Sequence, residues 1–207
     1  MRVLLDDRPI EIEPVTVARA IEAARESANA EGRIVIEVLG DGRSVDQQLI
    51  ESPPADTAGF AELKLVTADP GAFVAVTLSD SGSLLEAAAD GHQRAADELM
   101  AGNREEAIAP LSEALQAWQV VRDVIEKSAA LLGLDARAVA CTWKSGSVTG
   151  GEIIDGLTEK LGEVKRTLTE QDDSALSDVL AYDMPEQVER WRALLKQLES
   201  IAAEGRA

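Results

Sequence analysis

The chain is poor in the two side chains that build most catalytic and metal centres. Its 207 residues contain one histidine, His92, and one cysteine, Cys141. A zinc site made of His and Cys needs four such ligands, and a di-iron bundle needs a Glu-x-x-His pair on each of two helices. A catalytic triad could draw only on His92 as its base. We therefore predict no catalytic residue, no metal ligand and no cofactor-binding residue.

The sequence also predicts no intrachain disulfide and no membrane-spanning helix. A single cysteine cannot form an intrachain disulfide, which favours a reducing compartment. Charges arrive early, at Asp6 and Asp7, and no stretch approaches the roughly 18 apolar residues that a membrane helix needs. We expect a cytoplasmic protein that does not enter a membrane.

Aromatic residues are scarce, at 3% of the chain, although 45% of the residues are hydrophobic. The core must therefore consist mainly of Ala, Leu, Val and Ile, which favours close helix packing over a large aromatic-lined pocket. His92 falls on an apolar helical stripe, and Cys141 is a small apolar side chain. We interpret both as buried core residues and not as a base and a nucleophile.

Basic residues are outnumbered: 20 Lys and Arg stand against 38 Asp and Glu, a formal net charge of -18. Residues 1–69 hold 7 basic and 14 acidic side chains, which leaves 13 and 24 for the rest, so the acidity is not confined to a tail. Such a surface repels nucleic-acid phosphates and anionic lipids. We predict no nucleic-acid or membrane partner; the acidity suits a basic protein partner, or it serves solubility alone.

Residues 1–69 have the pattern of a small mixed domain. The expected order is a strand over 2–6, a strand over 9–13, a helix from the cap Thr16 to Gly32, a strand over 33–39, a short helix over 46–51 and a strand over 61–67. This order resembles the β-grasp fold of ubiquitin-like proteins. Members that act as tags or sulfur carriers share a free terminal Gly-Gly, whereas this chain continues through Asp69 into more protein. The resemblance therefore implies a docking module without that chemistry.

Residues 70–207 switch to a helical period and predict an antiparallel bundle of four main helices. The first stripe runs from Val74 to Leu99 and gives one long helix, or two if residues 80–82 break it. The second helix begins near Asn103, and Pro110 predicts a kink or a later start. The third covers 154–168. A short helix precedes a final one that Asp183 is expected to cap. The fold class is α+β.

The stretch 133–151 is the longest without periodicity. Within it, residues 144–151 have the small side chains of a phosphate loop but lack the Gly-Lys-Ser/Thr ending that places a lysine on the phosphates. We interpret them as a flexible linker. Residues 41–46 likewise fail as a calcium loop, because Arg43 and Val45 occupy positions that need oxygen ligands.

These patterns favour a non-enzymatic protein-interaction module, such as an adaptor, chaperone or assembly factor. Small acidic export chaperones of flagellar and type III secretion systems are similar in size, charge and helical content. The alternatives are a carboxylate-based enzyme, with or without magnesium, acting between the two halves, and a structural homo-oligomer such as a homodimer. For partner contacts we select Trp143 and Tyr182, because Trp and Tyr are enriched at interfaces and both lie in or beside connecting segments.

Overall fold

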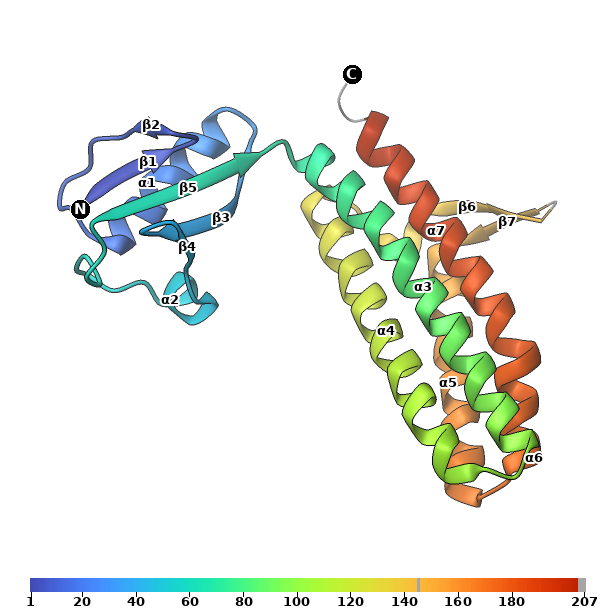
Figure 1. Ribbon diagram of the computed structural model, residues 1–207. Helices are drawn as coiled ribbons and strands as arrows, with labels where there is room; N and C mark the ends of the chain where they lie inside the picture. The colour runs from blue at the N-terminus through green and yellow to red at the C-terminus, as the bar shows by residue number, and fades with distance from the viewer. Residues whose placement is uncertain (145, 205–207) are drawn as a thin grey trace. The chain divides into compact units, whose positions relative to one another are not determined.

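The protein is an α+β chain that divides into two compact units, Met1–Phe73 and Val74–Ala207. The computed structural model describes residues 1–144 and 146–204 (Figure 1). Secondary structure changes from mainly strand to mainly helix where α3 begins, at Pro70. The boundary predicted from the sequence, between residues 69 and 70, coincides with the start of α3. The first unit extends to Phe73, so it includes the first turn of α3.

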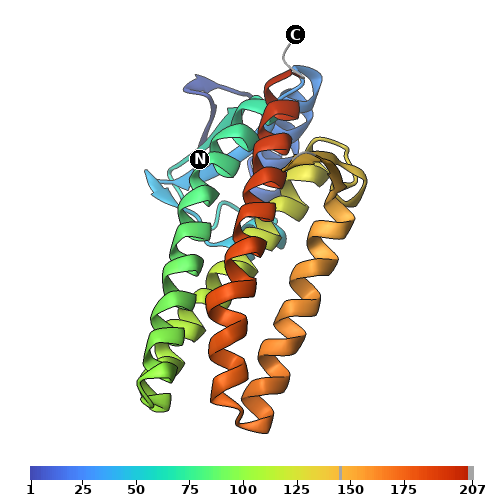
Figure 2. The same cartoon turned by 90° about the vertical axis from the view of Figure 1, so that its right-hand side faces the viewer.

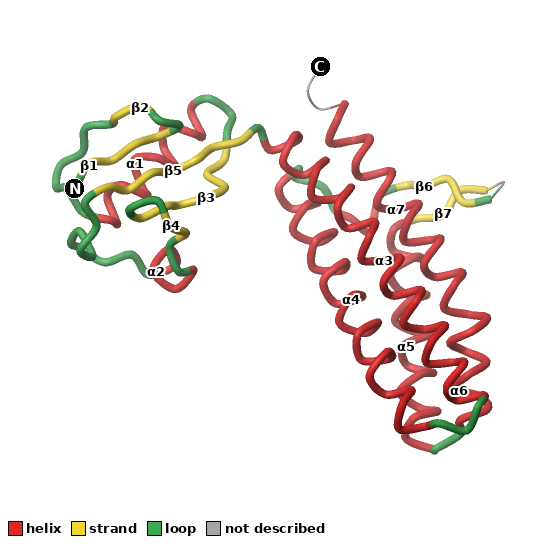
Figure 3. Tube along the Cα trace, in the orientation of Figure 1, coloured by secondary structure: helices red, strands yellow, loops and turns green. Residues whose placement is uncertain are grey.

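The first unit contains a five-stranded mixed sheet, drawn in yellow in Figure 3. Its strands are β1 (Arg2–Leu5), β2 (Arg8–Pro9), β3 (Ile34–Gly40), β4 (Arg43–Ser44) and β5 (Glu62–Ala68). Their order is β2-β1-β5-β3-β4; β1 and β5 are parallel at the centre, and the other neighbours are antiparallel. This arrangement confirms the β-grasp-like fold expected from the order of elements.

One helix, α1 (Val17–Ala30), packs against β3 and β5 of this sheet (Figure 1). It begins where predicted, because the Thr16 hydroxyl oxygen accepts a hydrogen bond from the Arg19 amide at 3.2 Å. Its apolar stripe is buried together with Leu63 and Leu65, which alternate along β5. The short helix α2 (Gln47–Glu51) is capped by Asp46.

The second strand is much shorter than the predicted 9–13. Asp6 and Asp7 both adopt left-handed backbone angles, as the two-residue turn of a tight hairpin requires. The Asp6 carboxylate also accepts from the Thr67 amide at 2.8 Å and from the Thr67 hydroxyl at 2.5 Å. These bonds tie the turn to β5, and they hold the pKa of Asp6 below its usual value.

The second unit is a bundle of four long helices, and consecutive long helices run in opposite directions (Figures 1 and 2). They are α3 (Pro70–Met100), α4 (Arg104–Leu131), α5 (Gly150–Glu170) and α7 (Met184–Glu204). Apolar side chains from all four helices form one continuous core, which includes Trp118 and Trp191. In the part of the chain that the structure describes, no helix combines the length and apolar content needed to cross a bilayer.

The first two long helices run through both of the points at which a break was considered. Residues 80–82 do not interrupt α3. The hydroxyls of Ser81 and Ser83 donate to carbonyls of the preceding turn, a contact that serines can make inside a helix. Pro110 is buried inside α4, which begins six residues before it, at Arg104. The alternative of a helix that starts only after Pro110 is therefore wrong. There α3 approaches closely: a Cβ on Gly91 would lie 2.8 Å from the Pro110 carbonyl oxygen.

The final helix begins at Met184, directly after Asp183 as predicted, but the predicted capping role of Asp183 is wrong. The chain passes from α6 (Asp173–Asp178) through a π-helical turn, η2 (Val179–Asp183), directly into α7. Asp183 does not cap a helix, because its carboxylate is engaged by Lys160 at 3.0 Å. The preceding helix, α6, does begin with an Asp cap, since Asp172 accepts from the Ala175 amide.

The flexible linker expected over 144–151 is also wrong. The connection between α4 and α5 contains a short 3-10 helix, η1 (Ala136–Ala138), and a hairpin of β6 (Ala140–Trp143) and β7 (Gly146–Thr149); residue 145 lies outside the described residues. Buried Cys141 attaches this hairpin to the bundle core. Thr149 then forms a capping box with Glu152, so α5 begins directly after β7 with no flexible residues between them.

Candidate functional site

The first sequence-selected contact residue, Trp143, is the last residue of β6 and is half-buried. Its ring is flanked by two cations: the Lys144 Nζ lies 5.3 Å from the ring centroid, and the Arg190 Cζ lies 5.8 Å from it. Both distances suit attraction between a cation and an aromatic face. Arg190 belongs to α7, so this contact attaches the end of β6 to that helix.

Glu186, one turn before Arg190 on α7, extends the same cluster. Its Oε1 accepts from the Arg190 guanidinium at 2.8 and 3.1 Å, and its Oε2 lies 4.0 Å from the Lys144 Nζ. All these side chains are partly exposed, so each ion pair adds little stability by itself. Together they orient Trp143 on the helix surface.

The second selected residue, Tyr182, lies in η2 and is 76% exposed, the highest fraction among the large hydrophobic side chains that the structure describes. It precedes Glu186 by four residues, in the π-helical turn that leads into α7. We call the surface made by Trp143, Lys144, Tyr182, Glu186 and Arg190 the hairpin–α7 face. The structure places Trp143 against Arg190 of α7 and Tyr182 in the turn before α7; a role of either residue in partner contacts stays a prediction.

The single histidine is a core residue, as predicted. His92 is 2% exposed, and its Nε2 accepts a hydrogen bond from the Trp118 indole N–H at 3.3 Å. Burial lowers the His92 pKa from 6.5 to about 4, so the imidazole is neutral near pH 7. Trp118 in turn packs edge-on against Trp191, with ring centroids 5.5 Å apart.

The single cysteine is also buried, which confirms its assignment to the core. Cys141 is 2% exposed, and burial raises the pKa of its thiol. A protonated, shielded thiol is a poor nucleophile. Within residues 1–144 and 146–204, no three His, Cys, Asp or Glu side chains are grouped so that they could hold a metal ion.

A cleft of about 450 Å³ opens on the second unit, at the end of the bundle where the connection from α4 to α5 passes. Its walls come from α4, η1 and the residues before it, α5 and α7. Apolar side chains form the interior and four charged ones complete the lining: Ile125, Ala129, Ala130, Leu134, Ala136, Ile154 and Trp191, with Arg122, Glu126, Asp135 and Arg137. Sequence reasoning did not identify this cleft.

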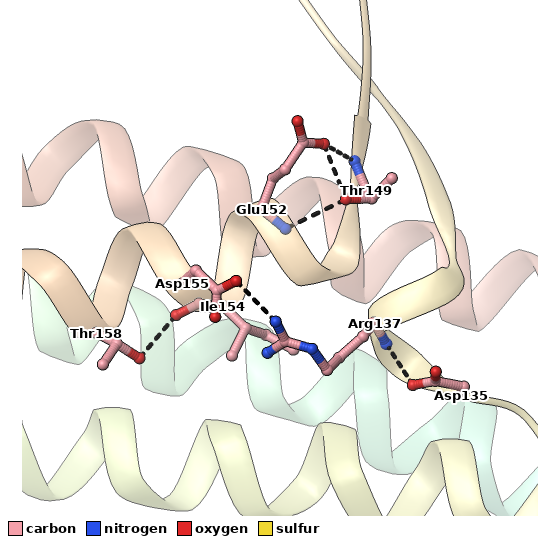
Figure 4. Close-up of polar contacts among 7 residues, drawn as sticks. All are labelled: Asp135, Arg137, Thr149, Glu152, Ile154, Asp155 and Thr158. Atoms are coloured by element: carbon pink, nitrogen blue, oxygen red, sulfur yellow. Dashed lines mark hydrogen bonds and ion pairs between the residues drawn. The ribbon is translucent and has the colours of Figure 1, made fainter.

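The polar contacts beside the cleft hold its η1 wall in place (Figure 4). The Arg137 guanidinium donates to the Asp155 carboxylate at 2.7 Å, which raises the pKa of Arg137 and lowers that of Asp155. Asp135 caps η1 by accepting from the Arg137 amide at 2.9 Å. Backbone packing is tighter still, since a Cβ on Gly150 would lie 2.0 Å from the Ala136 carbonyl oxygen.

Three buried side-chain polar atoms have no hydrogen-bond partner among the described residues. They are the Trp191 indole N–H, on a side chain that lines the cleft, the His92 Nδ1 and the Gln187 Oε1. An unpaired buried polar atom costs free energy unless a water or ligand satisfies it. Comparison of the chain with protein-family models, with curated proteins and with solved structures finds no match.

Proposed function

We propose that this chain is a protein-interaction module and that the hairpin–α7 face is its contact surface. One observation carries the proposal: Trp143, chosen from the sequence alone, lies against Arg190 of α7, and Tyr182, chosen in the same way, is 76% exposed in the turn that leads into α7. Trp, Tyr and Arg are the residue types that contribute most binding energy at protein interfaces. The face presents one of each.

The contacts around Trp143 support a surface that is organised before a partner arrives. Lys144 and Arg190 flank the ring, and Glu186 holds Arg190 with two hydrogen bonds. A side chain already held in one orientation loses less conformational entropy on binding. Tyr182 then offers a large, freely accessible ring with a hydroxyl at its tip.

The partner that fits best is a protein with a basic surface and an apolar pocket. The net charge of -18 attracts a basic partner over long range and speeds encounter. The pocket would receive the Tyr182 ring, whereas the charge complementarity would act around it. The carboxylate-based enzyme and the homo-oligomer stay as predictions from the sequence.

The experiment is capture of partners from a lysate of the source organism with tagged full-length chain, at low salt and at about 0.15 M salt. We expect one stoichiometric partner to persist at the higher salt and to be reduced at least about tenfold by Tyr182→Ala, since a hot-spot truncation costs about 2 kcal/mol. Val76→Ala is the matched control, because Val76 is 62% exposed on α3 and lies outside the face.

Three results would argue against the proposal: no partner above background, equal capture by Tyr182→Ala and wild type, or loss of capture only when residues 1–69 are deleted. The last result would assign binding to the β-grasp-like unit. Light scattering of the purified chain tests the homo-oligomer separately, because a stable dimer would have twice the 22.0 kDa mass of the chain.

A further inference from the structure

We propose that the cleft between α4, η1, α5 and α7 binds a small amphipathic monocarboxylate, with its hydrocarbon part inside and its carboxylate at Arg122. The proposal is independent of the hairpin–α7 face, because none of the five residues of that face lines this cleft. It rests on two features of the lining, an apolar interior and an unengaged cation at the rim, and a buried indole beside the cleft reports occupancy.

The interior of the cleft suits a short hydrocarbon chain. Ile125 and Ala129 on α4 are each 2% exposed, and Leu134 and Ile154 are half-buried on the facing walls. A volume of about 450 Å³ falls within the usual range of small-molecule sites, about 300–1,000 Å³, and such sites are mostly apolar and often lie between the helices of bundles. A slender aliphatic ligand therefore fits better than a polar one.

The rim supplies a cation that the protein itself does not use. Arg122 is exposed and makes no ion pair or hydrogen bond with a described residue, whereas Arg137 on the same rim is engaged by Asp155. A free guanidinium can hold a carboxylate with two parallel hydrogen bonds. The lining carries two arginines and two acidic side chains, and Arg122 is the arginine that no described carboxylate engages, so the carboxylate of a ligand is assigned to Arg122.

The acidic residues of the rim limit the ligand to one negative charge. Asp135 is occupied by its hydrogen bond to the Arg137 amide, but Glu126 makes no contact of this kind within the described chain. A second carboxylate on the ligand would meet Glu126 or lie in the apolar interior, and either position is unfavourable. The site should therefore prefer a monocarboxylate to a dicarboxylate of equal length.

Trp191 provides the readout of binding. Its side chain is fully buried, lines the cleft, and carries an indole N–H without a partner in the described chain. Whatever occupies the cleft lies next to this indole, so the Trp191 N–H resonance reports occupancy. Trp143 does not line the cleft and serves as an internal reference.

The test is a titration of the full-length, ¹⁵N-labelled chain with octanoate up to about 10 mM, the range of weak small-ligand binding. We expect saturable movement of the assigned Trp191 indole cross-peak, with the Trp143 cross-peak unchanged. Suberate, which has the same chain length and two carboxylates, and octylammonium, which has the opposite charge, should bind at least about tenfold more weakly. Octanoate that leaves Trp191 unmoved, or octylammonium that binds as tightly, would overturn the proposal.

Variants identify the cation. Arg122→Gln should weaken octanoate binding about three- to tenfold, the usual effect of losing a charge-assisted hydrogen bond in a partly exposed site. Arg25→Gln is the control: it removes the same charge from an exposed, unengaged helical arginine of the first unit and should change nothing. Ala130→Phe, at the exposed rim of the cleft, should abolish binding without disturbing the core. Equal affinities of Arg122→Gln and Arg25→Gln would refute the assignment.

Discussion

At the scale of single residues, His92 couples the bundle core to pH. The folded chain keeps its imidazole neutral with a pKa of about 4, whereas the unfolded chain has the ordinary value of 6.5. Between these values only the unfolded state binds the proton. The stabilisation that comes from keeping His92 neutral is therefore complete above about pH 6.5, and it is lost as the pH falls toward 4.

Wild-type protein should lose about 2 kcal/mol of unfolding free energy at pH 5 relative to pH 8 through this residue alone. His92→Gln keeps an acceptor for the Trp118 indole N–H but cannot titrate, so its pH dependence should be smaller by that amount. Urea unfolding of both proteins at the two pH values measures the difference. Parallel curves for the two proteins would mean that His92 does not carry the effect. Carboxylates also titrate over this pH range, but they contribute equally to the pH dependence of wild type and of His92→Gln, so they cancel in the difference between the two proteins.

The two contact residues were selected from the sequence on a local signal, and their role stays a prediction. Trp143 and Tyr182 are large interface-type side chains near connections, and exposure of Tyr182 follows from its lying off the apolar stripe of its helix. The cleft carries no such signal. Arg122 and Trp191 are 69 residues apart on different helices, and only the packing of α4 against α7 brings them to one site.

At the scale of elements, two glycines in helices have opposite roles. Gly91 lies where α3 meets α4, and an added Cβ would be 2.8 Å from the Pro110 carbonyl oxygen and 2.9 Å from the Ala114 Cβ. Neither neighbour is the flexible end of a side chain, so the helices must separate. Gly162 is exposed on α5, with no atom within 4 Å of the same position.

Gly91→Ala should lower the free energy of unfolding by about 1–3 kcal/mol through overpacking. Gly162→Ala should raise it by about 0.5–1 kcal/mol, because alanine loses less backbone entropy in a helix. Chemical denaturation of the two variants and wild type tests the pair. If both substitutions stabilise the protein, the close approach of α3 and α4 at Gly91 is refuted.

Element types followed from periodicity, whereas the connections between long helices did not. The helical stripes and the alternating residues of β3 and β5 reflect burial on one face, which a local window detects. The hairpin of β6 and β7 has only four residues a strand, and it is held by Cys141 against the bundle. The π-helical turn continues the chain from α6 into α7 without a break, so Asp183 resembled a cap where the helix never stops.

At the scale of the whole molecule, the excess of carboxylates dominates the electrostatics. The formal charge of -18 creates repulsion throughout the folded chain, and the compact state brings these charges closer together than the unfolded one does. Most of the ion pairs are exposed and individually weak. Screening of the repulsion should therefore outweigh screening of the pairs.

Raising NaCl from about 0.01 to about 0.3 M shortens the screening length from roughly 30 Å to under 10 Å. We expect the thermal midpoint to rise by several degrees over this range. Differential scanning calorimetry in a buffer of constant pH gives the midpoint directly. A fall in the midpoint would instead indicate that the ion pairs contribute more than the net charge.

The three tryptophans divide between surface and interior, and this gives the protein two separable optical signals. Trp143 is partly open to solvent on the hairpin–α7 face, whereas Trp118 and Trp191 are shielded in the bundle and packed against each other. A soluble quencher reaches the first and not the pair. Protection of the quenchable emission therefore reports a macromolecule on the surface, and a change in the unquenched emission reports an occupant of the bundle, so both events can be followed in one unlabelled sample.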